Sequence, residues 1–409
     1  MRVRRRLLWA APAARGLLVA AGLLLAATLA GLVLLWPGSS TTSGSSAIGH
    51  TESGRVVSVT RSACEEGTCR FVEVEILSGP DRGRAAIVSL TPQAKAPSYD
   101  VGQRVRVLPN QRQSGVGAGA PPARLPGANP GARPLGQYTY SIVDYDRRLP
   151  ILWLALAFAA LVVLAGRLRG LFSLVGLGLG ILVVTQFVVP AMLEGRSPFL
   201  VALVGSLAAM FLTIGLTSGL SIQSLAAALG IALSLLVAAG LGLLYVHIAH
   251  LTGAGSDLAF TLRQQRPGLS LQGLVLAGFV IGALGVLADM AVTQASAVMA
   301  LRRADPTLGP RGLYREAFTI GRDHLSATVN TLVFAYVGAS LPLLLVFTTA
   351  GVTFTDAINS QDVAESVVAT LVGAIGVVAS VPFTTGLAAL LASALPPEAV
   401  PVDHAHHHH

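Results

Sequence analysis

Long apolar runs alternate with short polar stretches over most of the chain. The first run covers residues 16–36, and at about 1.5 Å per helical residue it crosses a hydrocarbon core of about 30 Å. Similar runs follow a hydrophilic block and lie at 150–165, 171–193, 199–217, 224–246, 271–301, 325–347 and 365–395. The pattern predicts a membrane-embedded, all-α bundle of about eight transmembrane helices.

Residues 37–149 form the hydrophilic block, where the hydrophobic period changes to two. Alternation typical of half-buried strands occurs at 54–60, 71–77, 85–90 and 104–108. Gly-Pro-Asp at 79–81 is a turn signal, and residues 38–47 and 109–136 have the composition of flexible linkers. We expect a small β-barrel-like domain, with an OB-like fold as one form of it.

The composition favours a lipid environment for most of the chain. Only 12% of the 409 residues are charged, against about 25% in an ordinary soluble domain. Such a deficit argues against a soluble enzyme and against intrinsic disorder. The 28 basic residues exceed the 20 acidic ones and give a net charge of +8. Because they mainly flank the apolar runs, as topogenic signals do, we expect no nucleic-acid partner.

The distribution of arginine predicts how the chain is oriented. Twelve arginines lie in the segments on the side of the N-terminus, at 1–15, 166–170, 218–223 and 302–324. Three lie in the short loops on the other side, at 194–198, 247–270 and 348–364. By the positive-inside rule, both termini are cytoplasmic and residues 37–149 are extracytoplasmic. With its Arg-, Ala- and Gly-rich composition, the chain is predicted to be a multi-pass protein of a bacterial plasma membrane.

Few residues favour metal, cofactor or enzyme chemistry. Cys64 and Cys69 are too few for a zinc site, so we expect a hairpin-closing disulfide or, alternatively, a reduced structural pair. The histidine-rich tail within 396–409 is either a tag remnant or a native metal-loving segment. No Walker, Gly-x-Ser-x-Gly or His-Glu-x-x-His motif occurs. We therefore expect no enzymatic activity, no metal and no cofactor.

The deepest ionisable residue in a predicted span is Asp289. Helical spacing places Gly282, Gly285, Asp289 and Thr293 on one face, and Gly278 with Gly282 forms a small-xxx-small packing pair. An ionisable side chain at this depth is costly, so it marks a candidate functional site. The stripe is interpreted either as the lining of an ion or substrate path or as a packing face whose carboxylate fixes assembly.

Other polar side chains form a separate interface cluster or, like Thr293, are candidates for the same path. Arg322, Asp323 and His324 form a polar cluster at the cytoplasmic boundary, where Arg322 and Asp323 have the spacing of an interfacial ion pair. Asn330 lies about two turns deeper and is an expected partner of Asp289, because an amide both donates and accepts hydrogen bonds. The remaining candidates are Gln186, Gln294 and Glu365.

Several linked motifs connect the chain with a known family. They are Asp146-Arg147, Ile281-Gly-Ala-Leu-Gly-Val-Leu-Ala-Asp-Met-Ala-Val-Thr-Gln-Ala-Ser296, Ile320-Gly-Arg-Asp323, Asn330-Thr-Leu-Val-Phe-Ala-Tyr-Val-Gly338, Leu341-Pro342, Glu365, Val372-Gly-Ala-Ile-Gly376 and Pro382. With them the chain resembles the YibE/F-like family of bacterial multi-spanning membrane proteins. The resemblance implies an anchor, an external β-domain and a bundle of further spans, without an assigned activity. Where the family usually has Ser or Ile near position 294, this chain has Gln294, which adds a hydrogen-bonding group.

These features predict a secondary transporter or permease for an unknown small solute or ion. Asp289 would be the coupling carboxylate, and the polar side chains of the spans would line the path. The alternative is a non-transporting envelope sensor or assembly scaffold that works through the β-domain. In either case the bilayer is a partner, and assembly as a homo-oligomer is compatible with the pattern.

Overall fold

The structure, a computed structural model, describes residues 12–38, 51–64, 67–90, 98–109, 133–134, 140–219, 221–255 and 257–394. The chain divides into two compact units, one of Met1–Ser39 with Val162–His409 and the other of Ser40–Leu161. The expected tail at 396–409 and most of the two expected linkers lie outside the described residues.

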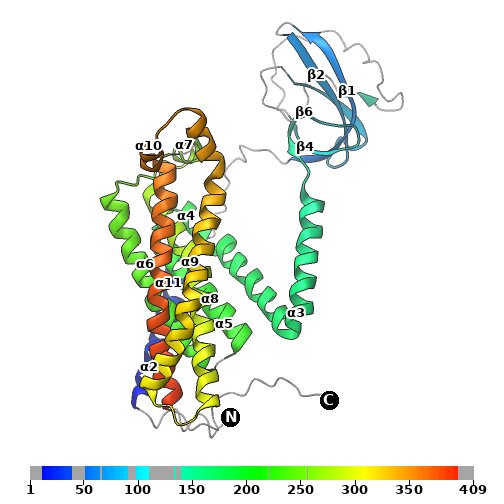
Figure 1. The fold of residues 1–409 in the computed structure, drawn as a ribbon. Coiled ribbons are helices and arrows are strands. Elements are labelled where there is room, and N and C mark those ends of the chain that lie inside the picture. The colour runs from blue at the N-terminus through cyan, green and yellow to red at the C-terminus, as the bar shows by residue number, and fades with distance from the viewer. Residues whose placement is uncertain are drawn as a thin grey trace. The chain divides into compact units, whose positions relative to one another are not determined.

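The smaller unit contains a curled, six-stranded sheet (Figure 1). Its strands are β1 (Glu52–Cys64), β2 (Gly67–Ile76), β3 (Arg84–Leu90), β4 (Arg104–Pro109), β5 (Arg133–Pro134) and β6 (Tyr140–Tyr145). The order is β5-β3-β2-β1-β4-β6, and of these pairings β3 with β5 is parallel and the others are antiparallel. The four predicted strands thus correspond to β1–β4.

Alternating side chains explain why this sheet closes around a core. Val56, Val72, Val74, Val105 and Val107 are each 0% exposed and belong to one apolar cluster. The register of β1 against β2 shifts between Val56 and the residue at 58, and such a bulge bends a strand. The bend curls the sheet into a half-barrel, which is the form that the predicted β-barrel-like domain takes.

Helices make up the larger unit and the last part of the smaller one. They are α2 (Pro12–Leu35), α3 (Arg148–Val183), the π-helix η1 (Val184–Val188), α4 (Val189–Leu193), α5 (Pro198–Ser218), α6 (Ile222–Ile248), α7 (Asp257–Gln265), α8 (Leu271–Ala304), α9 (Pro310–Thr349), α10 (Phe354–Asn359) and α11 (Gln361–Ser393). Within the described residues, seven helical stretches are long and apolar enough to cross a membrane.

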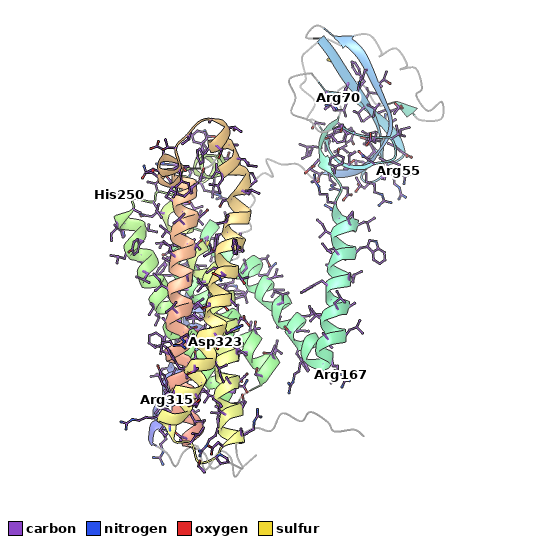
Figure 2. The ribbon with its side chains drawn as sticks, in the orientation of Figure 1. Arg55, Arg70, Arg167, His250, Arg315 and Asp323 are labelled. Carbon is purple, nitrogen blue, oxygen red and sulfur yellow. The ribbon has the colours of Figure 1, made fainter. Side chains whose placement is uncertain are left out.

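One of those stretches, Arg148–Leu193, accounts for two of the eight predicted spans. Its 46 residues correspond to about 69 Å of helix, more than twice a hydrocarbon core of about 30 Å. The helical backbone is broken at Arg167, which has φ 49° and is labelled in Figure 2. Gly170 lies against the carbonyl of Val162, where a Cβ would not fit. The break thus falls in the predicted loop at 166–170, between the predicted spans 150–165 and 171–193.

The core of the larger unit lies where α6, α8 and α11 contact one another, with α5 and α9 packed around them (Figure 1). Small residues allow this close approach. A Cβ on Gly376 of α11 would lie 3.2 Å from the Cβ of Ala238 on α6 and 3.4 Å from a methyl group of Leu287 on α8. In a bilayer the hydrophobic effect does not drive helices together, because lipid tails are as apolar as the side chains. Close packing contacts of this kind stabilise the bundle instead.

Contacts between loops show which helix ends lie together. At one end, Gly38 N donates to Glu194 Oε2 at 2.8 Å, and Thr252 Oγ1 donates to Gln361 Oε1 at 2.9 Å. The opposite ends of the helices carry most of the arginines, such as Arg302 and Arg303 at the end of α8. The bundle is therefore asymmetric in charge along its helix axes.

Candidate functional site

The site begins with the exposed face of α8 around Asp289. The side chain of Asp289 is 67% exposed, although its neighbours Leu287 and Met290 are completely buried. Gly282, Gly285 and Thr293 are also exposed and lie with Asp289 on one helical face. Asp289 is therefore an open carboxylate near the middle of an apolar helix, not a close-packed one.

The antiparallel neighbour α9 brings an imidazole to this carboxylate. His324 Nε2 lies 3.9 Å from Asp289 Oδ2, and the His324 side chain is 42% exposed. Further along, the hydroxyl of Tyr336 lies 3.2 Å from the position of a Cβ on Gly282, so the missing side chain allows α9 to approach. The carboxylate can accept a proton or hold a cation, and the imidazole can exchange a proton with it.

Gln294, which we expected to line a path, lies in the helix-packing core instead. Its side chain is 2% exposed, and five residues of helix turn it by about 140° from the face of Asp289. Oriented by its hydrogen-bond partners, the amide donates to Ala317 O at 3.3 Å and accepts from Gly321 N at 3.2 Å. The hydroxyl of Thr385 on α11 lies 3.4 Å from the same amide. Gln294 thus clamps α8, α9 and α11, because a buried amide is costly unless it is hydrogen-bonded.

The other expected path residues do not converge on Asp289 in any described contact. Asn330 is exposed on α9, and six residues of helix turn it by about 240° from His324. Gln186 is exposed in η1, where Pro190 lacks the amide hydrogen that would bond to the Gln186 carbonyl in an α-helix. Glu365 accepts a hydrogen bond of 2.8 Å from Gln361 Nε2 in the first turns of α11. The sequence does not determine how the helices are rotated against one another, so it could not show which of these side chains face Asp289.

Two further expectations are modified by the contacts. Arg322 and Asp323 are both exposed, and the described ion pairs do not join them. Of the three expected packing glycines, Gly282 receives Tyr336, whereas a Cβ on Gly278 or Gly285 would meet nothing within 4 Å. Gly278 and Gly285 therefore have open space beside them on the surface of this unit.

Sequence reasoning missed the glycines that hold the core together. A Cβ on Gly230 of α6 would lie 2.9 Å from the Cβ of Thr384 on α11, and Gly321 leaves room for the Gln294 amide. To find small residues that face each other on different helices, one must know which helices are neighbours. Hydropathy does not show which helices are neighbours. These contacts therefore had no signal in the sequence.

The β-unit contains a polar cluster that the sequence did not reveal. The buried Tyr140 hydroxyl lies 2.9 Å from Asp81 Oδ2 and 3.3 Å from Glu52 Oε2, so it donates into a pair of carboxylates. Burial, followed by the hydrogen bond to Asp81, raises the pKa of Tyr140. Cys69, at one end of the expected disulfide with Cys64, is disulfide-bonded.

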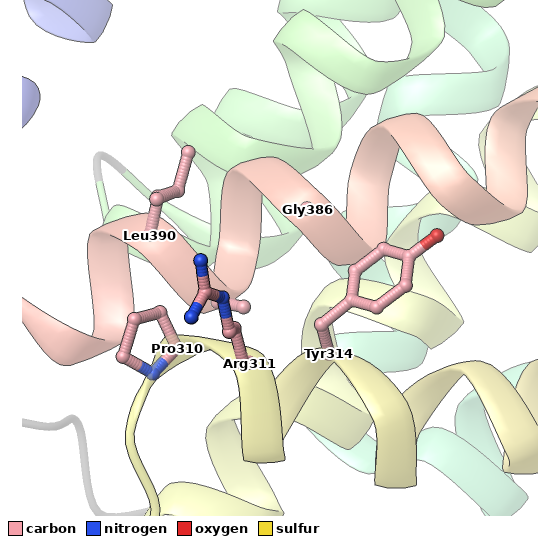
Figure 3. Close-up of a pocket in the computed structure, with 6 residues that line it drawn as sticks. Pro310, Arg311, Tyr314, Gly386 and Leu390 are labelled. Atoms are coloured by element: carbon pink, nitrogen blue, oxygen red, sulfur yellow. The ribbon is translucent and has the colours of Figure 1, made fainter.

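A separate hollow lies at the arginine-rich end of the bundle (Figure 3). It measures about 330 Å³, and its almost wholly apolar lining comes from Pro310, Arg311, Tyr314, Gly386, Ala389 and Leu390. None of the expected path residues lines it. Within the described residues, no group of three or more His, Cys, Asp or Glu side chains is placed to hold a metal ion.

A bundle of long apolar helices joined to a half-barrel defines a multi-pass membrane protein. The model of the family described as YibE/F-like protein matches residues 154–394, more than half of the chain. The chain therefore belongs to the YibE/F-like family, which confirms the resemblance found in its motifs. No curated protein and no solved structure matches the chain.

Proposed function

We propose that this protein is a secondary transporter or permease that moves a small solute or ion with the help of Asp289. The observation that carries the proposal is the exposure of the Asp289 side chain, 67% beside the completely buried Leu287 and Met290. A carboxylate used only to fix packing would be enclosed by its partner helix. An ionisable group at membrane depth belongs on a protein- or water-lined path.

In this proposal Asp289 binds the coupling proton or cation, and His324 is the polar side chain beside that binding site. The His324 imidazole lies 3.9 Å from the carboxylate. The exposed Gly278, Gly282 and Gly285 leave space for a solute or water beside the carboxylate. The path is therefore assigned to α8 and α9, without Gln294.

The orientation is part of the same proposal. Arg302, Arg303 and Arg311 lie at helix ends that we assign to the cytoplasm, and we assign the break in α3 at Arg167 to the same side. The β-unit then lies outside, where the disulfide of Cys69 is chemically reasonable. In a bacterium this corresponds to the plasma membrane, and transport of this kind needs no enzymatic step.

The test is ion flux through the full chain in proteoliposomes that contain a pH-sensitive dye. A membrane potential is imposed with K⁺ and valinomycin, in separate runs with and without a Na⁺ gradient. Asp289→Asn is expected to abolish flux, because the amide has no exchangeable charge. Asp323→Asn, an exposed carboxylate on α9, is the matched control and is expected to keep it. Equal flux in Asp289→Asn and the parent, or parent flux no greater than that of empty liposomes, contradicts the proposal.

The second candidate is an envelope sensor or scaffold, and the independent core of the β-unit favours it. Ser40–Leu161 forms its own compact unit around the cluster of Val56, Val72 and Val105. A domain that folds around its own core is suited to partner binding. Deletion of residues 44–140 separates the two candidates, since a transporter keeps solute movement and a sensor or scaffold loses its activity.

A further inference from the structure

The outer face of α9 carries a seam of exposed residues at alternating spacings of four and three. The seam comprises Glu316, Ile320, Asp323, Ala327, Asn330, Phe334, Val337 and Leu341, all of which are exposed. This spacing gives the 3.5-residue period of helices that pack along their length against a partner helix. Phe334 at 74% and Leu341 at 52% are among its most exposed apolar members.

The polar member at the centre of the seam is Asn330. It lies at the midpoint of α9, and the nearby Leu332 packs against Gly373 near the middle of α11. Exposed residues of α11 have similar spacing, at Val367, Leu371, Ile375 and Val378, but that face is wholly apolar and suits lipid. An amide at the same depth is costly in lipid, because its donors and acceptor need partners.

The chemistry of the seam favours a second copy of the same chain as its cover. An asparagine amide has both a donor and an acceptor, so two of them across a twofold axis satisfy each other. Residues 149–165 of α3 offer the amide less, because their one polar side-chain group is the indole N–H of Trp153.

We propose that the protein is a homodimer in which the α9 seams of two copies pack in parallel. Asn330 pairs with its symmetry mate, and Ala327, Phe334, Val337 and Leu341 form the apolar contact around it. Small Ala327 allows the backbones to approach, as is typical of helix packing in lipid. His324 flanks the seam, so the Asp289–His324 pair lies at the edge of the dimer.

Cysteine cross-linking of the full chain in native membranes tests the dimer. Cys69 is disulfide-bonded and the sequence has only two cysteines, so an introduced cysteine supplies the reactive thiol. Oxidation with copper-phenanthroline is expected to link copies that carry Ala327→Cys, Asn330→Cys or Phe334→Cys. Leu371→Cys, equally lipid-exposed on α11, is the matched control and is expected to remain monomeric.

The outcomes are distinct. Dimers at the seam positions without dimers at position 371 support the proposal. Absence of dimers at all three seam positions, or equal cross-linking at 371, overturns it. A cross-link within one chain between Asn330→Cys and Ala157→Cys would identify α3 as the cover and also overturn it.

A second measurement keeps the test independent of the oxidant. In lipid vesicles, dimerisation measured by energy transfer between labelled copies is expected to weaken about 3- to 30-fold in Asn330→Leu, the range for an interhelical hydrogen bond in a membrane. Thr331→Val is the adjacent control, because the Thr331 hydroxyl already donates to Ala327 O of its own helix at 2.9 Å. Equal dissociation constants for Asn330→Leu and the parent would refute the role of the amide.

Discussion

The clamp formed by Gln294 gives the sharpest prediction about the stability of the bundle. In Gly321→Ala the new Cβ overlaps the end of the Gln294 amide that accepts from Gly321 N, lies 2.6 Å from its Cδ and lies 3.0 Å from a methyl group of Val381. No methyl group fits between three packed helices at those distances. Either the amide leaves its partners on α9, or α9 moves away from α8 and α11.

The cost follows from these contacts. Overpacking of a core by one methyl group costs about 1–3 kcal/mol. Loss of the two interhelical hydrogen bonds adds about 1 kcal/mol, since such bonds average about 0.6 kcal/mol each in a membrane. We therefore expect Gly321→Ala to lower the free energy of unfolding by about 2–4 kcal/mol.

A double-mutant cycle isolates the coupling between the two positions. Gln294→Ala removes the amide and leaves room for the alanine at 321, so the second substitution is expected to cost about 1–3 kcal/mol less than it does alone. The assay is SDS-induced unfolding of the full chain, followed by far-UV circular dichroism. Gly285→Ala on α8 is the control, because its Cβ would meet nothing within 4 Å. Strictly additive effects at 294 and 321 would refute the clamp.

Two further predictions concern other parts of the fold. Gly230→Ala places a Cβ 2.9 Å from Thr384 Cβ and is expected to lower the midpoint temperature of thermal unfolding. Gly240→Ala is the control and is expected to leave that midpoint unchanged, because its Cβ would meet nothing within 4 Å. Equal midpoints for the two variants would contradict this packing. Tyr140→Phe removes the donor to Asp81 and is expected to destabilise the β-unit by about 1.5–3 kcal/mol at pH 7. Because the pKa of Tyr140 is raised in the folded state, its stabilising effect is present below about pH 10 and is lost as the pH rises further. Circular dichroism and phenolate absorbance from pH 7 to 12 check this, and an equally steep alkaline loss in Tyr140→Phe would disprove it.

Much of the architecture was accessible from hydropathy. Each predicted span corresponds to a helix or part of one, because a chain in lipid must satisfy its backbone within helices of sufficient length. The alternation of apolar and polar residues around Val72 and Val105 likewise predicted β2 and β4, because a strand of this kind buries the side chains of one of its two faces. The break at Arg167 also falls in a predicted loop, marked by two arginines and two glycines.

The candidate site could be predicted only in part. Asp289 was recognisable from its depth in an apolar run, but its neighbour was not. Asn330 is the partner that chemistry predicts, whereas the structure brings His324 to within 3.9 Å of Asp289 and turns Asn330 outward. The rotation of one helix against another depends on contacts such as Gln294 with Gly321, which involve residues far apart in sequence.

By itself, the sequence determined which segments are solvated by lipid, which alternate as strands, and which carboxylate is deep in a span. Those properties are local, because transfer of a side chain out of water depends mainly on the side chain itself. Only the tertiary structure decided that Gln294 is a buried clamp, that Asp289 is open beside His324, and that Asn330 lies on an exposed face of α9. These properties depend on helix rotation and close packing, which arise from the sum of many weak contacts between distant residues.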